Sequence, residues 1–220
     1  MKKFLCTFFL CMLTAVTLTV SARAAEDIIK AGLYYGDGAL YSANLENYEG
    51  SGYDLGWYDE ATRDFNRIGF LSDTAISMTA DGTIYRSGKV YSASRPAQTY
   101  STIGGYHVQL REEFPSFDEA AYAAGQLEDA FPAFINNAYR VRMGSFATRE
   151  EAEIAAATYA TRSWRDRYGM DRAASGDAVA PSATGIVVTS TGTDRILFVF
   201  DCSGAKSLGI LPNNGAGKAQ

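Results

Sequence analysis

A short pattern of alternating hydrophobic and polar residues occurs twice in the middle of the chain. The first copy begins at Tyr106 and reads Tyr-His-Val-Gln-Leu, and the second begins at Tyr139 and reads Tyr-Arg-Val-Arg-Met. Alternation with a period of two predicts a half-buried strand in each copy, with Val108 and Val141 on the buried faces. An internal repeat of this kind indicates two related strand-helix units that bury their apolar faces together.

Each predicted strand is followed by a sequence that favours the start of a helix. Ser116 is followed three residues later by Glu119, and Thr148 by Glu151, which is the spacing of a capping box. Alanine-rich runs follow both caps. The first helix is expected to end near Asp129, because the proline shortly after it cannot continue a helix.

Two more strands complete the predicted unit. Residues 131–135 are expected to form its second strand, and Asn136-Asn137 suits the positive φ of a tight hairpin turn before the third strand, residues 139–143. Residues 185–188 are expected to form the fourth strand. The order βαββαβ is the ferredoxin-like split pattern, so residues 105–190 are predicted to adopt an α+β fold.

The segments around the repeat are predicted to be mostly β-structure. Short strands separated by Gly-containing turns are expected at residues 28–35, 53–58, 67–71, 75–78 and 83–86, within a β-rich region spanning residues 25–91. Residues 92–104 are expected to be a linker. Residues 191–220 are expected to contain one strand, residues 195–201, and a disordered polar tail from Pro212 to Gln220.

The first residues have the pattern of an export signal. Lys2-Lys3 precede an apolar stretch that ends at Val20, and Ala22-Arg23-Ala24 offers the small-x-small motif of a cleavage site. Residues 1–24 are therefore predicted to be a signal peptide. A membrane anchor is the alternative, although the apolar stretch is at the short end for spanning a bilayer.

Charge and composition exclude several classes of function. The net charge of −5 would become more negative after cleavage, which argues against nucleic acid as the main partner. Cys6 and Cys11 fall in the predicted signal, so Cys202 would be left without a disulfide partner. With His107 as the only histidine, no Cys/His metal cluster can form, and no cofactor is expected. The acidic pairs Glu112-Glu113, Asp118-Glu119 and Glu150-Glu151 split across faces or suit helix starts, and a glycosidase dyad is the poorer explanation.

The two strand motifs resemble those of a SPOR (sporulation-related repeat) domain. That family carries Y-x-V-Q at one strand and Y-R-V-R-x-G-x-F at the other, and this chain has Tyr106-His-Val-Gln109 and Tyr139-Arg-Val-Arg-Met-Gly-Ser-Phe146. The first copy departs from the family at Arg111-Glu112, where a Gly-Ser-like turn is usual. The resemblance covers residues 105–189. It implies binding to peptidoglycan, chiefly to glycan strands stripped of their peptides.

The rest of the chain resembles the first part of SpoIID/LytB (stage II sporulation protein D) family proteins. The similar segments are residues 29–36, 196–201 and 208–212. In that family a glycan-cleaving domain follows, with its acidic catalytic residue in a motif like Pro-Tyr-Glu-Met, and this sequence contains no such motif. The resemblance therefore implies a secreted, non-catalytic cell-wall protein related to sporulation or division. The alternative is a truncated lytic transglycosylase whose catalytic domain lies beyond this chain.

The repeat also predicts a glycan-binding face. If the helices cover the side of the sheet that carries Val108 and Val141, the opposite side stays open. The polar side chains expected there are His107, Gln109, Arg111, Arg140 and Arg142, with Ser145 just beyond. Gln can bond to N-acetyl amides, and the Arg fork matches the lactyl carboxylate of a stripped glycan. A solvated face without a ligand, or a module that recognises a cell-envelope protein by edge-strand pairing, is the alternative.

Overall fold

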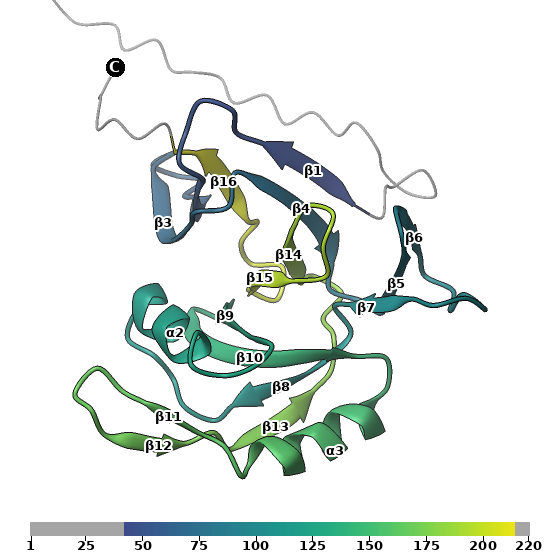
Figure 1. Ribbon diagram of the computed structural model, residues 1–220. Coiled ribbons are helices and arrows are strands. Elements are labelled where there is room, and N and C mark those ends of the chain that lie inside the picture. Colours follow the sequence, from purple (N-terminus) through teal and green to yellow (C-terminus); the bar gives the residue numbers. More distant parts are fainter. Residues whose placement is uncertain (1–41, 214–220) are drawn as a thin grey trace, which may run out of the picture. The chain divides into compact units, whose positions relative to one another are not determined.

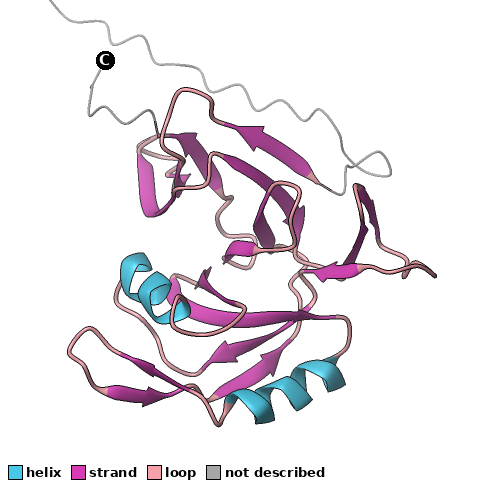
Figure 2. Ribbon diagram, in the orientation of Figure 1, coloured by secondary structure: helices cyan, strands magenta, loops and turns pink. Residues whose placement is uncertain are grey.

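The computed structural model describes residues 42–213, which are mainly strands joined by short loops, with two helices among them (Figure 2). The strands are β1 (Ala43–Glu46), β2 (Tyr53–Tyr58), β3 (Phe65–Leu71), β4 (Ala75–Ala80), β5 (Ile84–Ser87), β6 (Val90–Ser92), β7 (Ser101–Ile103), β8 (Tyr106–Leu110), β9 (Ala130–Ile135), β10 (Ala138–Phe146), β11 (Ser163–Arg165), β12 (Asp171–Ala173), β13 (Gly176–Val179), β14 (Ile186–Ser190), β15 (Ile196–Asp201) and β16 (Gly209–Pro212). The helices are α2 (Phe117–Ala124) and α3 (Arg149–Tyr159). The predicted signal peptide, the predicted strand at residues 28–35 and residues 214–220 lie outside the described residues.

A large mixed sheet organises the described part of the chain. It has eight strands in the order β1-β4-β14-β15-β9-β10-β8-β13 (Figure 1). Neighbouring strands run antiparallel, except that β15 and β9 are parallel. Strands that precede and follow the repeat in sequence therefore belong to the same sheet as the repeat. With many strands and two helices in the described residues, the fold is of the α+β class and rich in β-structure.

The repeat forms one end of this sheet. Its strands lie in the order β9-β10-β8-β13, and α2 and α3 pack against them. The first three strands and both helices confirm the sequence prediction, but the predicted fourth strand is wrong. Residues 185–188 fall largely in β14, which pairs with β4 and β15, and β13 takes the position beside β8. The more apolar segment occupies the middle of the sheet, where burial is greatest, and Gly-Asp-Ala-Val forms the edge.

Local sequence signals place the helix ends and the hairpin turn. Thr148 and Glu151 form the complete capping box of α3, whereas at α2 Ser116 accepts the backbone N–H of Glu119 and the Glu119 carboxylate pairs with Arg167 instead. Asn136 and its neighbour have φ angles of 49° and 68°, which confirms the positive-φ turn between β9 and β10. The α2 helix ends at Ala124, before the position near Asp129 that the sequence suggested.

Three small sheets accompany the large one. They have the orders β16-β2-β3, β6-β5-β7 and β11-β12. The short strands predicted between residues 53 and 86 are confirmed within one or two residues at their ends. Residues 92–104, which the sequence suggested as a linker, contain β7 and the fully buried Ile103, so this segment is part of the fold. The tail predicted to be disordered begins with Pro212, which belongs to β16 and pairs with Tyr53.

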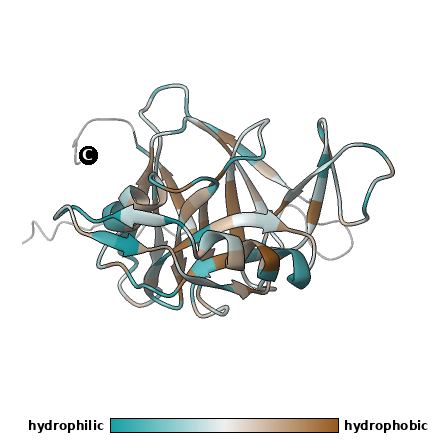
Figure 3. Ribbon diagram, turned by 60° about the horizontal axis from the view of Figure 1, so that its bottom comes forward, coloured by the Kyte–Doolittle hydropathy of each residue, from teal (hydrophilic) through white to brown (hydrophobic). Residues whose placement is uncertain are grey.

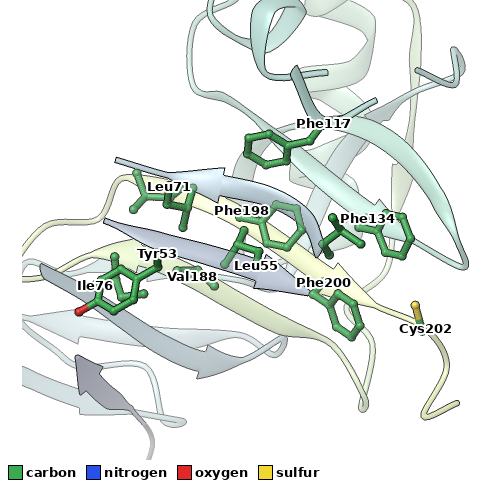
Figure 4. Close-up of a cluster of buried hydrophobic side chains, with 12 residues drawn as sticks. Tyr53, Leu55, Leu71, Ile76, Phe117, Phe134, Val188, Phe198, Phe200 and Cys202 are labelled. Atoms are coloured by element: carbon green, nitrogen blue, oxygen red, sulfur yellow. The ribbon is translucent and has the colours of Figure 1, made fainter. Parts of the chain in front are cut away.

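The hydrophobic core lies on both faces of the large sheet. On one face, residues of the β2–β3 hairpin pack with Phe117 of α2, Phe134 of β9 and Phe198 of β15 (Figure 4). A second cluster lies between the repeat strands and the two helices, around Val108 and Val141. On the opposite face a third cluster joins the β6-β5-β7 sheet to the large one. Strands in the interior are accordingly more hydrophobic than the surrounding loops (Figure 3).

Candidate functional site

The side chains predicted to bind glycan do not share one open face. Gln109 is half-buried and accepts a hydrogen bond from Arg142 Nε at 3.0 Å. Arg111 is exposed at 66% of its side chain and Arg140 at 21%. Gln109 on β8, Arg111 directly after β8 and Arg140 on β10 keep some exposure to solvent, and we call these three residues the polar rim. Ser145 of β10 is also partly exposed.

Both arginines of the polar rim are paired with acidic side chains. Arg111 Nε and Nη2 donate to the two carboxylate oxygens of Asp177 at 2.8 and 2.7 Å. Arg140 Nη2 donates to Glu113, and its Nη1 donates to the carbonyl of Arg111 at 3.2 Å. The hydrogen bonds that Arg111 donates to Asp177 raise the pKa of Arg111 and lower the pKa of Asp177. The rim is therefore close to neutral and rich in hydrogen-bonding groups.

His107 and Arg142 are buried, so the expectation that they face solvent is wrong. The side chain of His107 is 0% exposed and that of Arg142 is 5% exposed. The covering residues come from the region before the repeat: Ile84 of β5 and Ile103 of β7 pack with Phe131 and Ala133 of β9. His107 also meets Phe131 edge-on, with ring centroids 5.3 Å apart. The β6-β5-β7 sheet and the turn before it therefore close this part of the predicted binding face.

Asp81 is the residue that sequence reasoning missed. It follows β4 and lies 3.7 Å from both buried side chains: its Oδ1 is that far from His107 Nε2, and its Oδ2 is that far from Arg142 Nη1. We call Asp81, His107 and Arg142 the buried charge cluster. In the sequence, Asp81-Gly82 is readable only as a turn dipeptide. Nothing in the pattern links it to two strands of the repeat.

Hydrogen bonds and close contacts hold the Asp81 turn against the loop between β13 and β14. The Asp81 N–H donates to Gly185 O at 2.8 Å, and Asp81 Oδ2 accepts the N–H of Ser182 at 3.1 Å. Gly104 has a φ of +67°, and a Cβ added to it would lie 2.7 Å from Gly82 O. A Cβ at Gly185 would lie 2.6 Å from the Cβ of Asp81. The turn thus fits against two glycines that leave room for it.

Burial and the nearby acids have opposite effects on the pKa of Arg142. Burial lowers the pKa of Arg142, while the charges of Asp81 and Asp201 raise it. Burial alone would raise the pKa of Asp201, but hydrogen bonds from Thr184 and Ser203, together with the charge of Arg142, lower it overall. Two acids and one permanently charged base therefore lie near each other in the interior of the protein.

Other features of the described residues offer less chemistry. Ser145, the last predicted site residue, donates its hydroxyl to Gly104 O at 2.6 Å and so has a structural partner. A shallow polar depression is lined by Ser72, Asp73, Thr74, Ala75, Ser190 and Thr191. The carboxylate of Asp73 pairs with Arg195. Cys202 is a buried free thiol.

No group of three or more His, Cys, Asp or Glu side chains within residues 42–213 could hold a metal ion. None of the helices in this part of the chain has the length and apolar character needed to cross a bilayer.

Comparison with known proteins identifies no relative of this chain. A scan against protein-family models, a search of curated proteins and a search of solved structures each find no match for this chain.

Proposed function

We propose that this chain is an exported, non-catalytic cell-wall protein that binds the glycan strands of peptidoglycan through its repeat. The observation that carries the proposal is the strand order β9-β10-β8-β13, with antiparallel neighbours and both helices on the face of Val108 and Val141. This is the order of a ferredoxin-like βαββαβ unit, with β13 as its fourth strand. The arrangement supports the resemblance of the two strand motifs to SPOR domains.

The polar rim is the part of the predicted face that a glycan can reach. An arginine has five N–H donors, and Arg111 and Arg140 each use only some of them on Asp177 and Glu113. Because each arginine is already paired with an acid, the rim suits the hydroxyl and N-acetyl groups of sugars better than it suits a strongly anionic ligand. Gln109, whose strand partners are Arg142 on β10 and Asp177 on β13, offers an amide group as the N-acetyl substituent does.

The environment of His107 supports a non-catalytic role. Nucleophilic catalysis by Ser or Cys needs a positioned base, and acid-base catalysis most often uses histidine. The only histidine of the chain is fully buried, and its ring nitrogens face Gly144 O and Asp81. It therefore has no access to a substrate bound at the surface.

Retention of the full chain on purified sacculi tests the proposal. We expect stronger retention on amidase-treated sacculi, which carry peptide-stripped glycan, than on intact sacculi. The double variant Arg111→Ala/Arg140→Ala should weaken retention about tenfold or more, because a hydrogen bond to a charged group contributes about 1.5–3 kcal/mol. The matched control is Arg149→Ala, which removes an exposed arginine paired with Glu153 on α3. Equal retention on both kinds of sacculi would contradict glycan binding.

A further inference from the structure

Hydrogen bonding fixes where one proton of His107 lies. Its Nδ1 is 2.6 Å from the carbonyl oxygen of Gly144, and a carbonyl can only accept a hydrogen bond. Nδ1 must therefore carry a proton. The state of the other ring nitrogen, Nε2, then decides whether His107 is neutral or positively charged.

Nε2 faces the Asp81 carboxylate, whose Oδ1 also has no hydrogen-bond partner among the described residues. The two atoms are 3.7 Å apart, and Nε2 has no partner within the described part of the chain. Arg142 Nη1 is the third such atom in the buried charge cluster. If His107 were neutral and Asp81 ionised, two buried acceptors would face each other, each without a hydrogen bond. Buried polar groups without partners cost stability, so one more proton is needed between them.

The charge balance of the surroundings leads to the same conclusion. The ionisable groups of the buried charge cluster besides His107 are Asp81 on the turn after β4 and Arg142 on β10, and the charge of Asp201 on β15 also acts on Arg142. On β13, Asp177 is exposed and bound to Arg111. Phe131 of β9 and Ile103 of β7, which also cover this region, are uncharged. Two carboxylates and one guanidinium leave one negative charge, and a proton on the His107–Asp81 pair cancels it.

We propose that the His107–Asp81 pair of the folded protein holds one extra proton above pH 7, so that protonated His107 Nε2 faces the Asp81 carboxylate as an ion pair. This makes the buried charge cluster a pH-sensitive clasp. The clasp joins the turn after β4 to β8 and β10 of the repeat. Because the two groups are close and coupled, the proton belongs to the pair and not to either residue alone. Loss of the proton leaves the two acceptors facing each other and weakens the attachment of the turn.

The sign of the pH dependence follows from proton counting. A histidine in an unfolded chain loses its proton near pH 6.5, at about its ordinary value. Above that pH the folded state holds one more proton than the unfolded state, so stability falls as pH rises. Below about pH 6 both states hold the proton, and this contribution is fully present and constant. One proton of difference changes the unfolding equilibrium constant by up to about tenfold for each pH unit.

Urea unfolding of the full chain between pH 6.5 and 8.0 tests the clasp. We expect the unfolding constant of the unmodified chain to rise up to about tenfold per pH unit. The variant Asp81→Asn removes the carboxylate but supplies an amide donor for neutral Nε2, so its stability should no longer fall with pH. His107→Gln, which removes the only histidine, should also lose the dependence.

The matched control is Asp177→Asn, which removes a carboxylate of the same sheet outside the clasp. It should keep the full pH dependence of the unmodified chain. An unmodified chain whose stability is constant or rises over this pH range would overturn the proposal, whether or not the variants fold. A slope that persists unchanged in Asp81→Asn would also overturn it.

Discussion

Gly185 has no side chain, and this allows Asp81 of the buried charge cluster to lie directly against its backbone. Its backbone accepts the Asp81 N–H, and a Cβ at this position would lie 2.6 Å from Asp81 Cβ and 2.9 Å from its Oδ2. Gly185→Ala should therefore push the Asp81 turn away from the loop between β13 and β14 and lower the free energy of unfolding by about 1–3 kcal/mol. Urea unfolding at pH 6 measures this loss.

The neighbouring glycine provides the control for this substitution. A Cβ added at Gly82 would meet nothing within 4 Å, so Gly82→Ala should change stability by no more than about 0.5 kcal/mol. Similar losses in Gly82→Ala and Gly185→Ala would show that the turn responds to any change in backbone freedom. The close approach of Gly185 to Asp81 would then not be the cause.

At the level of single elements, α3 depends on its capping box. Thr148 Oγ1 accepts the Glu151 N–H at 3.2 Å, and Glu151 Oε2 accepts the Thr148 N–H at 3.2 Å. Thr148→Ala should lower the free energy of unfolding by about 1 kcal/mol, measured from the urea midpoint. Thr158→Ala is the matched control on the same helix, because Thr158 is exposed and its hydroxyl donates to the Ile154 carbonyl of the same helix. It should leave stability unchanged or raise it slightly, since alanine favours helix.

The sequence specifies the elements of the repeat better than their neighbours in the sheet. Alternation around Val108 and Val141, the cap at Thr148 and the turn at Asn136 are local signals, and each gives the correct element. The identity of the fourth strand is not local: β13 and β14 are both short, and only the pairing of β14 with β4 and β15 removes it from the repeat.

The candidate site could not be predicted for the same reason, because it depends on contacts between segments that are far apart in the sequence. Alternation correctly places His107 and Arg142 on the side opposite the helices, but it cannot show what covers that side. On that side Asp81 faces both residues, and Ile84 and Ile103 pack on the neighbouring strand β9; all three come from strands and turns before the repeat. Arg111 and Arg140 keep their exposure because they lie beyond this cover, and their acidic partners are also set by the sheet pairing.

At the scale of the whole molecule, the repeat and its flanking strands share one sheet and one core. β15, which follows the repeat in sequence, lies between β9 and β14, and β4, which precedes the repeat, pairs with β14. Phe117 and Phe134 of the repeat pack with Leu55 and Phe198 from outside it. Separating the repeat from its flanks would expose these apolar side chains to water, so we expect residues 42–213 to unfold as one cooperative unit.

The two tryptophans of the chain can report on this cooperativity separately. Trp57 of β2 stacks on Phe134 at a centroid distance of 5.7 Å, and Trp164 of β11 lies 5.4 Å from Phe114 inside the repeat. In Trp57→Phe the fluorescence reports the repeat, and in Trp164→Phe it reports the β2–β3 hairpin. We expect the fluorescence midpoint of each variant in urea to coincide with that variant's own midpoint by far-UV circular dichroism. A repeat that unfolds at higher urea than the β2–β3 hairpin would instead mean that it forms an independent domain, on which the flanking strands are docked without sharing its stability.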